Sequence, residues 1–475
     1  MKNWKKLPLL LMLAFGIFWS CSEEEVPGPS IPDQTLKVNR FINDAMDYYY
    51  LWYDKMPNIN YSHEADSKEY FKKLLYQEDK WSFITDDLQG LLNSFEGIET
   101  SFGWSLAFYL FPDKVSVFAV VEYVYPHTPA ANAGLKRGDI ILKMNNASIT
   151  TQNYTDLMYA EDLDITLGVL NIDNQGKYII SPGTTAQMTA LELQLNPVLK
   201  TAIIEEGNHK IGYLFYAQYI DNYNSSIDTA LQSMIDNNVT DLVLDIRYNP
   251  GGIIFAAQHL CSSLAPLNIV NQESKLVTFQ WNTKRQKEYV NAQELDKIQV
   301  NFDKDVDVKM GLDKIHILTG DGTASASELT ITGLDPYMTV TTVGDTTYGK
   351  YTASRTLSAP ESHKDYDVLK NWGLQPIILR YANALGETDF KDGFVPDILV
   401  DDDLLNAYPL GDVNDPLFKA AIEDITGSVI TAKKSAETRS IPYKLFDRGF
   451  SKYDKNKRNL LIDDANKQLI REQLK

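Results

Sequence analysis

Cysteine and histidine are scarce in this chain, which has two cysteines and six histidines among its 475 residues. The histidines are scattered, and no Cys/His cluster with ligand spacing argues for a structural zinc site. Cys21 directly follows the N-terminal leader, and if it is acylated, as the sequence around it suggests below, Cys261 has no partner for an intramolecular disulfide. Cys261 sits in the helix-like apolar stretch AAQHLCSSLA, where we expect a small core residue.

Basic residues are outnumbered, since 45 Lys and Arg face 64 Asp and Glu and give a formal net charge of -19. An acidic surface argues against binding nucleic acid, and against binding anionic membranes through charge. The apolar fraction of 44% and the charged fraction of 23% are those of an ordinary globular protein. The composition therefore excludes classes of partner without indicating a fold.

The N-terminal apolar run is too short to span a bilayer. Leu7–Trp19 has 13 residues, whereas a spanning helix needs about 20. Three lysines precede it, which is typical of an export signal. Ser20–Cys21 at its end resembles a bacterial lipobox, so we expect cleavage after residue 20 and lipidation of Cys21. An ordinary secretory signal with an incidental cysteine is the alternative.

An acidic and proline-rich linker follows the leader. Ser22–Glu25 (SEEE) resembles the surface-export signal of Bacteroidetes lipoproteins. A solvated linker that carries no targeting signal is the alternative. The stretch VPGPSIPD then serves as a spacer. We therefore expect an exported lipoprotein anchored in the outer membrane, on its periplasmic or its cell-surface face.

The hydrophobic period changes twice along the chain and predicts a multidomain α/β protein. Helical spacing comes first, strands separated by polar turns follow from about Ser101, and strands alternate with helices from about Lys210. The predicted boundaries are a signal peptide at 1–20, a linker at 21–34, an N-terminal helical domain at 35–97, a β-rich domain at 98–199, an α/β core at 200–427 and a charged, helical tail at 428–475.

The β-rich domain resembles a PDZ domain. From His127 the chain reads HTPAANAGLKRGDIILKMNN, with a short helix, a glycine, a charged turn at Gly138–Asp139 and an apolar strand in the order of that family. The resemblance implies capture of peptides by their C-terminus, as an added strand. A small β domain used only for packing is the alternative.

The stretch Gly344–Tyr351 (GDTTYGKY) nearly spells a phosphate-binding loop. Such a loop needs a helix after it and a Ser or Thr after the lysine to hold Mg²⁺. Here Tyr351 follows Lys350, and the next residues are β-like. Nucleotide binding is therefore not expected, and Lys350 needs another role.

A second stretch places serines at a turn between a strand and a helix. It reads GDGTASASE from Gly320 to Glu328. The free N–H groups of a first helical turn can stabilise an oxyanion, and a serine hydroxyl needs a base, for which a buried lysine is suitable. A helix cap with Ser325 as N-cap and Glu328 closing a capping box fits this stretch equally well.

A third stretch, Asp245–Gly252 (DIRYNPGG), ends a buried strand with two glycines, which let the backbone approach a ligand. Taken together and in this order, the three stretches resemble the carboxy-terminal processing (tail-specific) serine peptidases, relatives of tricorn protease. The resemblance covers roughly residues 98–427 and implies a peptidase core related to ClpP and crotonase.

In that family the serine at Ser325 is the nucleophile and the lysine at Lys350 is the general base. The resemblance also implies a serine-type peptidase that needs no metal or cofactor and cleaves exported peptides or unfolded proteins. The other implied site residues are Ala326, Gly251 and Gly252 as oxyanion donors, with Asp245, Arg247 and Asn249 supporting the turn.

Two positions depart from the family pattern. The glutamine expected four residues after the lysine is Ser354, and the glycine expected directly after it is Tyr351. His259 and His316 lie near the motifs in sequence, and we expect both to be structural. Because of the departures, a surface-anchored module that binds peptides or apolar ligands on the same fold, without efficient catalysis, is the alternative function.

Overall fold

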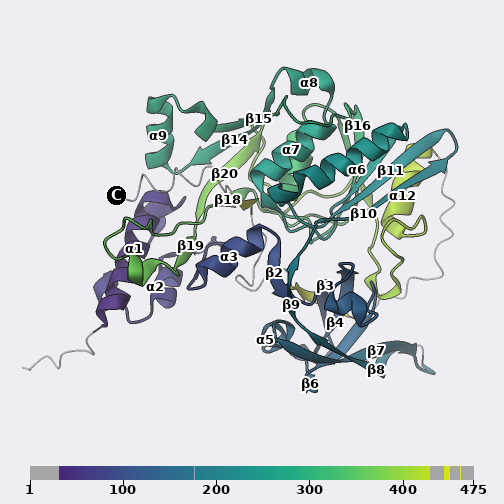
Figure 1. Cartoon of the computed structure of the whole chain (residues 1–475), viewed down its shortest axis with the longest axis horizontal. Coiled ribbons are helices and arrows are strands. Elements are labelled where there is room, and N and C mark those ends of the chain that lie inside the picture. Colours follow the sequence, from purple (N-terminus) through teal and green to yellow (C-terminus); the bar gives the residue numbers. More distant parts are fainter. Residues whose placement is uncertain (1–30, 176, 428–442, 450–459, 462–475) are drawn as a thin grey trace, which may run out of the picture.

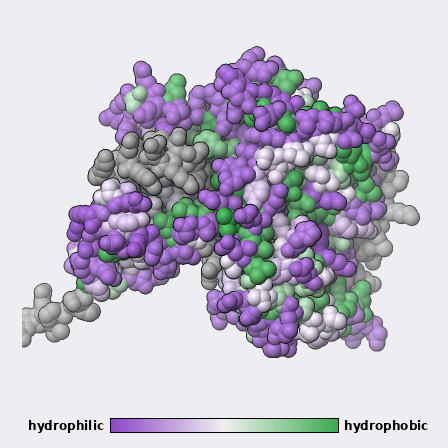
Figure 2. Space-filling view, in the orientation of Figure 1, coloured by the Kyte–Doolittle hydropathy of each residue, from purple (hydrophilic) through white to green (hydrophobic). Residues whose placement is uncertain are grey.

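The computed structural model describes residues 31–175, 177–427, 443–449 and 460–461 (Figure 1). The expected signal peptide and Cys21 lie outside the described residues. Within the described ranges, no helix combines the length and apolar character that crossing a membrane requires. Hydrophilic residues cover most of the face in Figure 2, and the hydrophobic residues visible there form scattered groups.

The N-terminal unit is mainly helical, as its periodicity predicts. Asp66 and Asp87 cap two of its helices by accepting backbone N–H groups. One segment differs from the prediction, because Phe83–Thr85 is a strand that pairs with Gly373–Gln375 of the core. The elements are α1 (Asp33–Tyr49), α2 (Ser67–Leu74), β1 (Phe83–Thr85) and α3 (Leu88–Phe95).

An antiparallel sheet in the order β22-β3-β4-β5-β7-β8 forms the PDZ-like unit, with two short helices. Its own apolar cluster includes Phe108, Val121, Ile141 and Met158. The elements are β2 (Ile98–Ser101), β3 (Trp104–Leu110), β4 (Val117–Val124), α4 (Pro129–Asn132), β5 (Ile140–Met144), β6 (Ala147–Ser148), α5 (Tyr154–Met158), β7 (Asp162–Ile172), β8 (Tyr178–Thr189) and β9 (Leu191–Gln194). Strand β22 (Lys444–Arg448) comes from the C-terminal tail.

The main sheet of the core has the order β10-β11-β12-β16-β17-β21, and all its neighbours are parallel except β10 and β11. Its strands β12 and β16 are almost wholly buried, which is typical of a sheet covered on both faces. The strands are β10 (Val198–Glu206), β11 (His209–Tyr216), β12 (Asp241–Asp245), β16 (Lys314–Thr319), β17 (Thr339–Gly344) and β21 (Ile398–Leu399).

Helices cover both faces of this sheet. Leu244 and Ile317 belong to the same apolar cluster as residues of α6, α7 and α10, whereas Val243 and Leu318 belong to the cluster that holds residues of α12. Neighbouring strand residues point to opposite faces, so the three helices lie on one face and α12 on the other. The helices are α6 (Asn224–Asp236), α7 (Ile254–Leu264), α10 (Ala326–Leu334) and α12 (Pro416–Thr426).

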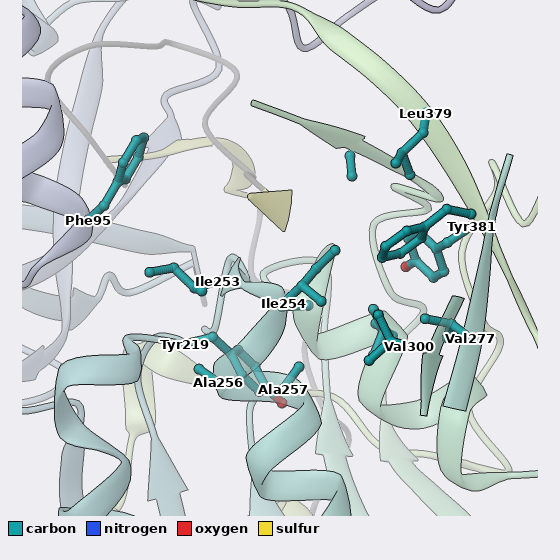
Figure 3. Close-up of a cluster of buried hydrophobic side chains, with 14 of the residues drawn as sticks. Phe95, Tyr219, Ile253, Ile254, Ala256, Ala257, Val277, Val300, Leu379 and Tyr381 are labelled. Carbon is teal, nitrogen blue, oxygen red and sulfur yellow. The ribbon is translucent and has the colours of Figure 1, made fainter. Parts of the chain in front are cut away.

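A second sheet of the core runs β13-β23-β18-β20-β14-β15. Figure 3 shows Ile253 and Ile254, where β13 leads into α7, and Leu379 and Tyr381 of β20 across from them. The strands are β13 (Gly252–Ile253), β14 (Lys275–Trp281), β15 (Gln299–Asn301), β18 (Thr352–Ser354), β20 (Ile377–Asn383) and β23 (Leu460–Leu461). The remaining elements are α8 (Leu267–Asn271), α9 (Thr283–Ala292), α11 (Tyr366–Leu369) and β19 (Gly373–Gln375).

The C-terminal tail differs from the predicted helix where the structure describes it. Lys444–Arg448 and Leu460–Leu461 are both strands, because each pairs with a strand of another unit. Charge pattern alone does not show such distant partners. The stretch whose sequence predicts the final helix, 463–475, lies outside the described residues.

Candidate active site

Ser325 occupies the turn between strand β16 and helix α10. It is the residue before Ala326, the first of the helix, and its φ of 65° is in the left-handed region. A non-glycine residue there costs of order 1 kcal/mol or more. Ser325 is fully buried, and its Oγ has no hydrogen-bond partner in the described part of the chain. Ser325 and Glu328 stand in the positions of a capping box, but the Ser325 side chain makes no cap hydrogen bond.

Glu328 joins the serine turn to the lysine turn. Its buried carboxylate accepts hydrogen bonds from the backbone N–H of Ser325 at 2.8 Å, of Gly349 at 2.6 Å and of Lys350 at 2.8 Å. The hydroxyl of Thr347 donates a fourth at 2.7 Å. Glu328 thus makes its half of the capping box and also fixes Lys350 relative to Ser325. Burial raises the pKa of Glu328, although these hydrogen bonds favour the ionised form.

Lys350 is fully buried near Trp81, an aromatic side chain of the N-terminal unit. Its Nζ lies 6.0 Å from the centroid of the Trp81 ring. The hydroxyl of Tyr381 lies 3.2 Å from the carbonyl oxygen of Ser325 and 3.3 Å from that of Lys350, and it donates toward both. Two side chains, Glu328 and Tyr381, therefore connect the backbones of the predicted nucleophile and the predicted base.

The Asn249–Gly252 turn packs directly on the nucleophile. A Cβ placed on Gly251 would lie 2.7 Å from Ser325 Cβ and 2.9 Å from the backbone nitrogen of Ala326, so only glycine fits. A Cβ on Gly252 would lie 2.1 Å from the carbonyl oxygen of Tyr219. The three sequence stretches therefore converge on Ser325, as their resemblance to the peptidases implies.

Asn249 organises this turn from within. Its Nδ2 donates to the carbonyl oxygen of Tyr216 at 2.8 Å, and its Oδ1 accepts the N–H of Gly251 at 2.9 Å. Its own carbonyl oxygen accepts the hydroxyl of Ser327 at 2.9 Å. The Gly251 amide, predicted as an oxyanion donor, is thus engaged by Asn249 in this conformation. The Ala326 amide begins α10, where N–H groups lack intrahelical acceptors.

Asp245 and Arg247 hold the end of β12 rather than face the serine. The buried guanidinium of Arg247 donates to Asp245 Oδ1 at 3.0 Å and to Asp415 Oδ1 at 2.8 Å, and it also pairs with Asp402 at 3.2 Å. Burial raises the pKa of Asp245, while Arg247 stabilises its carboxylate. Sequence reasoning missed Asp402 and Asp415. Asp415 precedes Pro416 as a helix N-cap signature, but that signature does not reveal its partner.

Ser354 and Tyr351, the two residues that depart from the family pattern, both contact other side chains around the site. Ser354 Oγ accepts the side-chain amide of Gln375 at 3.2 Å, and Gln375 Oε1 accepts the hydroxyl of Thr356 at 2.8 Å. Gln375 comes from β19 and was not predicted. Tyr351 lies edge-on to Trp81, with 6.3 Å between ring centroids.

The two histidines near the motifs pair with aspartates on helices. His259 of α7 lies 2.8 Å from Asp228 of α6, and His316 of β16 lies 2.8 Å from Asp424 of α12. Each contact joins two elements of the core, which agrees with the structural role expected for both residues.

Family models match three successive parts of the chain. Residues 210–400 match the model described as peptidase family S41, residues 37–83 match the S41 N-terminal domain, and residues 120–170 match a PDZ domain. The matched residues of the S41 model include Ser325, Lys350 and the Asn249–Gly252 turn.

Similar proteins carry related names. The carboxyl-terminal-processing protease of Synechocystis is 23% identical over 319 residues, which are 66% of each chain. The carboxy-terminal processing protease CtpB of Bacillus subtilis is 22% identical over 349 residues, 67% of this chain and 64% of that protein. The chain thus spans slightly less than two thirds of the length of these curated relatives.

Among solved structures, a Bacteroides fragilis protein assigned to the S41 proteases is 26% identical with a TM-score of 0.66. The match covers 82% of this chain and 97% of that one. The converging motifs, the three family models and this structure agree: the chain belongs to peptidase family S41, the carboxyl-terminal processing proteases, and carries the family's N-terminal domain and a PDZ domain.

Proposed function

We propose that the protein is a serine endopeptidase in which Ser325 is the nucleophile and Lys350 the general base. One observation carries the proposal. Three separate stretches of the chain meet at Ser325, a buried residue whose hydroxyl has no hydrogen-bond partner among the described residues. A buried hydroxyl without a hydrogen-bond partner costs free energy, so its presence in the site indicates a functional role.

The reaction begins when neutral Lys350 accepts the proton of Ser325 Oγ. The oxygen then attacks the scissile carbonyl carbon, and the tetrahedral intermediate carries a negative oxygen. When the intermediate collapses, Lys350 returns the proton to the leaving amine and an acyl-enzyme remains. Water, activated by Lys350, hydrolyses the ester and regenerates Ser325.

The oxyanion is held by backbone N–H groups. The amide of Ala326 is the first donor, because it begins α10 and lies beside Gly251. The Asn249–Gly252 turn supplies the second, from Gly251 or Gly252. If Gly251 is that donor, its N–H must leave Asn249 Oδ1, which holds it at 2.9 Å here. A small rotation of this turn then accompanies catalysis.

The substrates we propose are exported or extracellular peptides and unfolded proteins, captured through their C-terminus on the PDZ domain. A match to a PDZ domain at 120–170 supports peptide recognition by strand addition. The N-terminal sequence supports export and lipidation at Cys21, with the outer membrane as the location. The Ser–Lys mechanism uses neither a metal nor a cofactor.

Casein hydrolysis by the form lacking residues 1–21 tests this function across pH 6 to 10. We expect activity that rises with pH, because Lys350 must be neutral, and that falls at least 10³-fold in Ser325→Ala and in Lys350→Ala. Ser233→Ala and Lys287→Ala, at exposed helical positions, serve as matched controls and should retain full activity. Equal hydrolysis by Ser325→Ala and the parent chain would contradict the proposal.

A further inference from the structure

The C-terminal tail adds a strand to the molecule at two separate places. Strand β22 (Lys444–Arg448) extends the PDZ sheet, and strand β23 (Leu460–Leu461) lies within the second sheet of the core. Both places are sites where a peptidase of this kind would hold an extended substrate.

Strand β22 is bound to the PDZ domain in the way that a peptide ligand would be. It pairs antiparallel with β3 at the edge of the sheet, with Lys444 opposite Leu110 and Arg448 opposite Ala107. On its other side it meets helix α5, where the rings of Phe446 and Tyr154 are 5.5 Å apart and Tyr154 donates a hydrogen bond to Asp447. A strand added at a sheet edge is how PDZ domains capture peptides.

Gly449, the residue after β22, also bonds to strand β3 of the PDZ sheet. The N–H of Gly449 donates to the carbonyl oxygen of Leu106 at 3.0 Å. A Cβ on Gly449 would lie 2.3 Å from Met158 Sδ, so the tail backbone presses against the end of α5. A cavity of about 70 Å³ beside Gly449 is also lined by Pro250 of the catalytic turn. The groove on the PDZ domain therefore leads toward the active site.

Arg448 connects the occupied groove to the nucleophile turn. Its guanidinium pairs with the buried carboxylate of Glu122 on β4 and donates from Nε to Asp321 Oδ1 at 3.1 Å. Asp321 lies in the turn that precedes Ser325. A basic residue at this place in a bound peptide thus links the PDZ domain to the catalytic loop through two acidic side chains.

Strand β23 lies between the two catalytic stretches of the core. It pairs in parallel with β13, with Leu460 opposite Gly252, and with β18, where Leu461 is opposite Ser354. Gly252 belongs to the oxyanion turn, and Ser354 is in the strand that follows Lys350. Without β23, the facing edges of β13 and β18 would form a slot for one extended peptide, bonded on both sides.

We propose that the described tail strands, β22 (Lys444–Arg448) and β23 (Leu460–Leu461), are substrate-like segments bound in cis, which occupy the PDZ groove and the catalytic slot and compete with incoming peptides. Their role as inhibitors rests on the proposed peptidase function, whereas their binding does not. The ligand class that the two places accept is an extended peptide, with a basic residue where Arg448 meets Glu122 and Asp321.

Peptide binding in the full chain tests the proposal without depending on catalysis. The probe is a fluorescein-labelled peptide of residues 443–461, and all chains carry Ser325→Ala. The released variant adds Phe446→Asp, Arg448→Asp, Leu460→Pro and Leu461→Pro. Phe446→Asp removes the contact with the Tyr154 ring, Arg448→Asp repels Glu122 and Asp321, and the prolines cannot complete a central strand. A scrambled peptide is the control for sequence.

By fluorescence anisotropy, we expect the released variant to bind the probe at least tenfold more tightly than the parent chain, and the scrambled peptide to bind neither. Equal affinity in the two chains, or no binding to a released variant with native circular dichroism, would overturn the proposal. If the released variant does not fold, the full chain carrying Arg448→Asp alone replaces it under the same criteria.

Activity gives the second readout. With Ser325 intact, the released variant should hydrolyse casein at least tenfold faster than the parent chain, and the added peptide should lower that rate again. Unchanged rates in a chain that does cleave casein would contradict inhibition by the tail. Absence of hydrolysis in every form would count against the peptidase itself, while the anisotropy result would still decide whether the tail is a ligand.

Discussion

Ser325 shows at the scale of single residues how strain and burial prepare a nucleophile. Its φ of 65° and its unpartnered Oγ both cost stability, and the surrounding turn maintains both. The stabilising contacts are made through the backbone, where Glu328 accepts the N–H and Tyr381 donates to the carbonyl oxygen. The hydroxyl is thereby left available for the reaction.

Glu328 should be the most sensitive structural residue of the site. Glu328→Ala leaves the buried N–H groups of Ser325, Gly349 and Lys350 without an acceptor, at about 1–3 kcal/mol each. We expect the free energy of unfolding to fall by about 3 kcal/mol or more in urea titrations. Glu328→Gln keeps one carbonyl oxygen and should lose less.

The control is Glu294→Ala at an exposed position, which should change stability by less than about 0.5 kcal/mol. If Glu328→Ala were as stable as this control, the carboxylate would not be holding the two turns together.

Cys261 should be chemically inert in the folded protein. The thiol is fully buried on α7, and burial raises its pKa to about 12, so the reactive thiolate is scarce at pH 8. In the form lacking residues 1–21 it is the one cysteine present. We expect no alkylation by iodoacetamide at pH 8 in the native state and one adduct per chain in denaturant. Rapid labelling of the native protein would contradict this burial.

Among the site residues, those that belong to contiguous motifs were predictable and those that arrive from elsewhere were not. Ser325, Lys350 and the glycines stand in recognisable stretches, and the fold brings these stretches together. Gln375 reaches Ser354 from β19, 21 residues further along the chain. Only the folded arrangement of strands creates that contact, so sequence spacing gave no sign of it.

At the scale of elements, the junction between β13 and α7 depends on the close approach of two backbones. Gly252 has a φ of 143° and lies against the carbonyl oxygen of Tyr219, whose backbone forms a bridge to it. This contact sets the direction in which the oxyanion turn enters α7.

Gly252→Ala should therefore disrupt the site. Its Cβ would lie 2.1 Å from Tyr219 O, which no real contact permits, so the turn must move. We expect loss of more than about 2 kcal/mol of stability and at least 10²-fold of peptidase activity.

Gly207→Ala is the matched control. Gly207 also has a positive φ, 61°, but a Cβ there meets nothing within 4 Å. It should cost about 1 kcal/mol and leave activity unchanged. Similar losses in both variants would show that backbone strain, rather than the contact with Tyr219, is what matters.

Strand partners explain where the predicted elements were wrong. Phe83–Thr85 was assigned to a helical domain, yet it pairs with β19, and part of the predicted helical tail pairs with β3. Short strands of three to five residues carry little periodicity of their own. Their conformation comes from partners that lie 288 or more residues away in sequence, which local patterns do not report.

At the scale of the whole molecule, the PDZ domain and the core share one apolar cluster. Tyr123 of β4 and Tyr125 just after it pack with Phe215 and Tyr248 of the core. Arg137 of the PDZ domain donates to Asp402 at 2.9 Å, and Asp402 also pairs with Arg247. The Arg247 network below the catalytic turn is therefore connected to the PDZ domain.

Arg137→Ala should weaken this connection. It leaves the half-buried Asp402 with one fewer cation, and we expect the PDZ domain to unfold about 2 kcal/mol more easily than in the parent chain. Differential scanning calorimetry should then resolve an early transition. Lys136→Ala, at the neighbouring exposed position, is the control. A single unshifted transition in Arg137→Ala would show that the apolar contacts alone join the two domains.

The order of domains was predictable from the change of hydrophobic period, but their contacts were not. The predicted boundaries themselves remain predictions. Arg137 lies in the PDZ-like motif and gave no sign of its partner Asp402, 265 residues further on. Long-range ion pairs of this kind leave no local pattern in a single sequence.

The most direct test of the central claim is the site of labelling by a fluorophosphonate probe, read by peptide mass mapping. The claim predicts one adduct per chain, located on Ser325, that is lost in Ser325→Ala and at least 10²-fold slower in Lys350→Ala. The tail-released chain with Ser325 intact should react faster than the parent. An adduct on another serine, or none on Ser325 in the released chain, would contradict the assignment of Ser325 as the nucleophile.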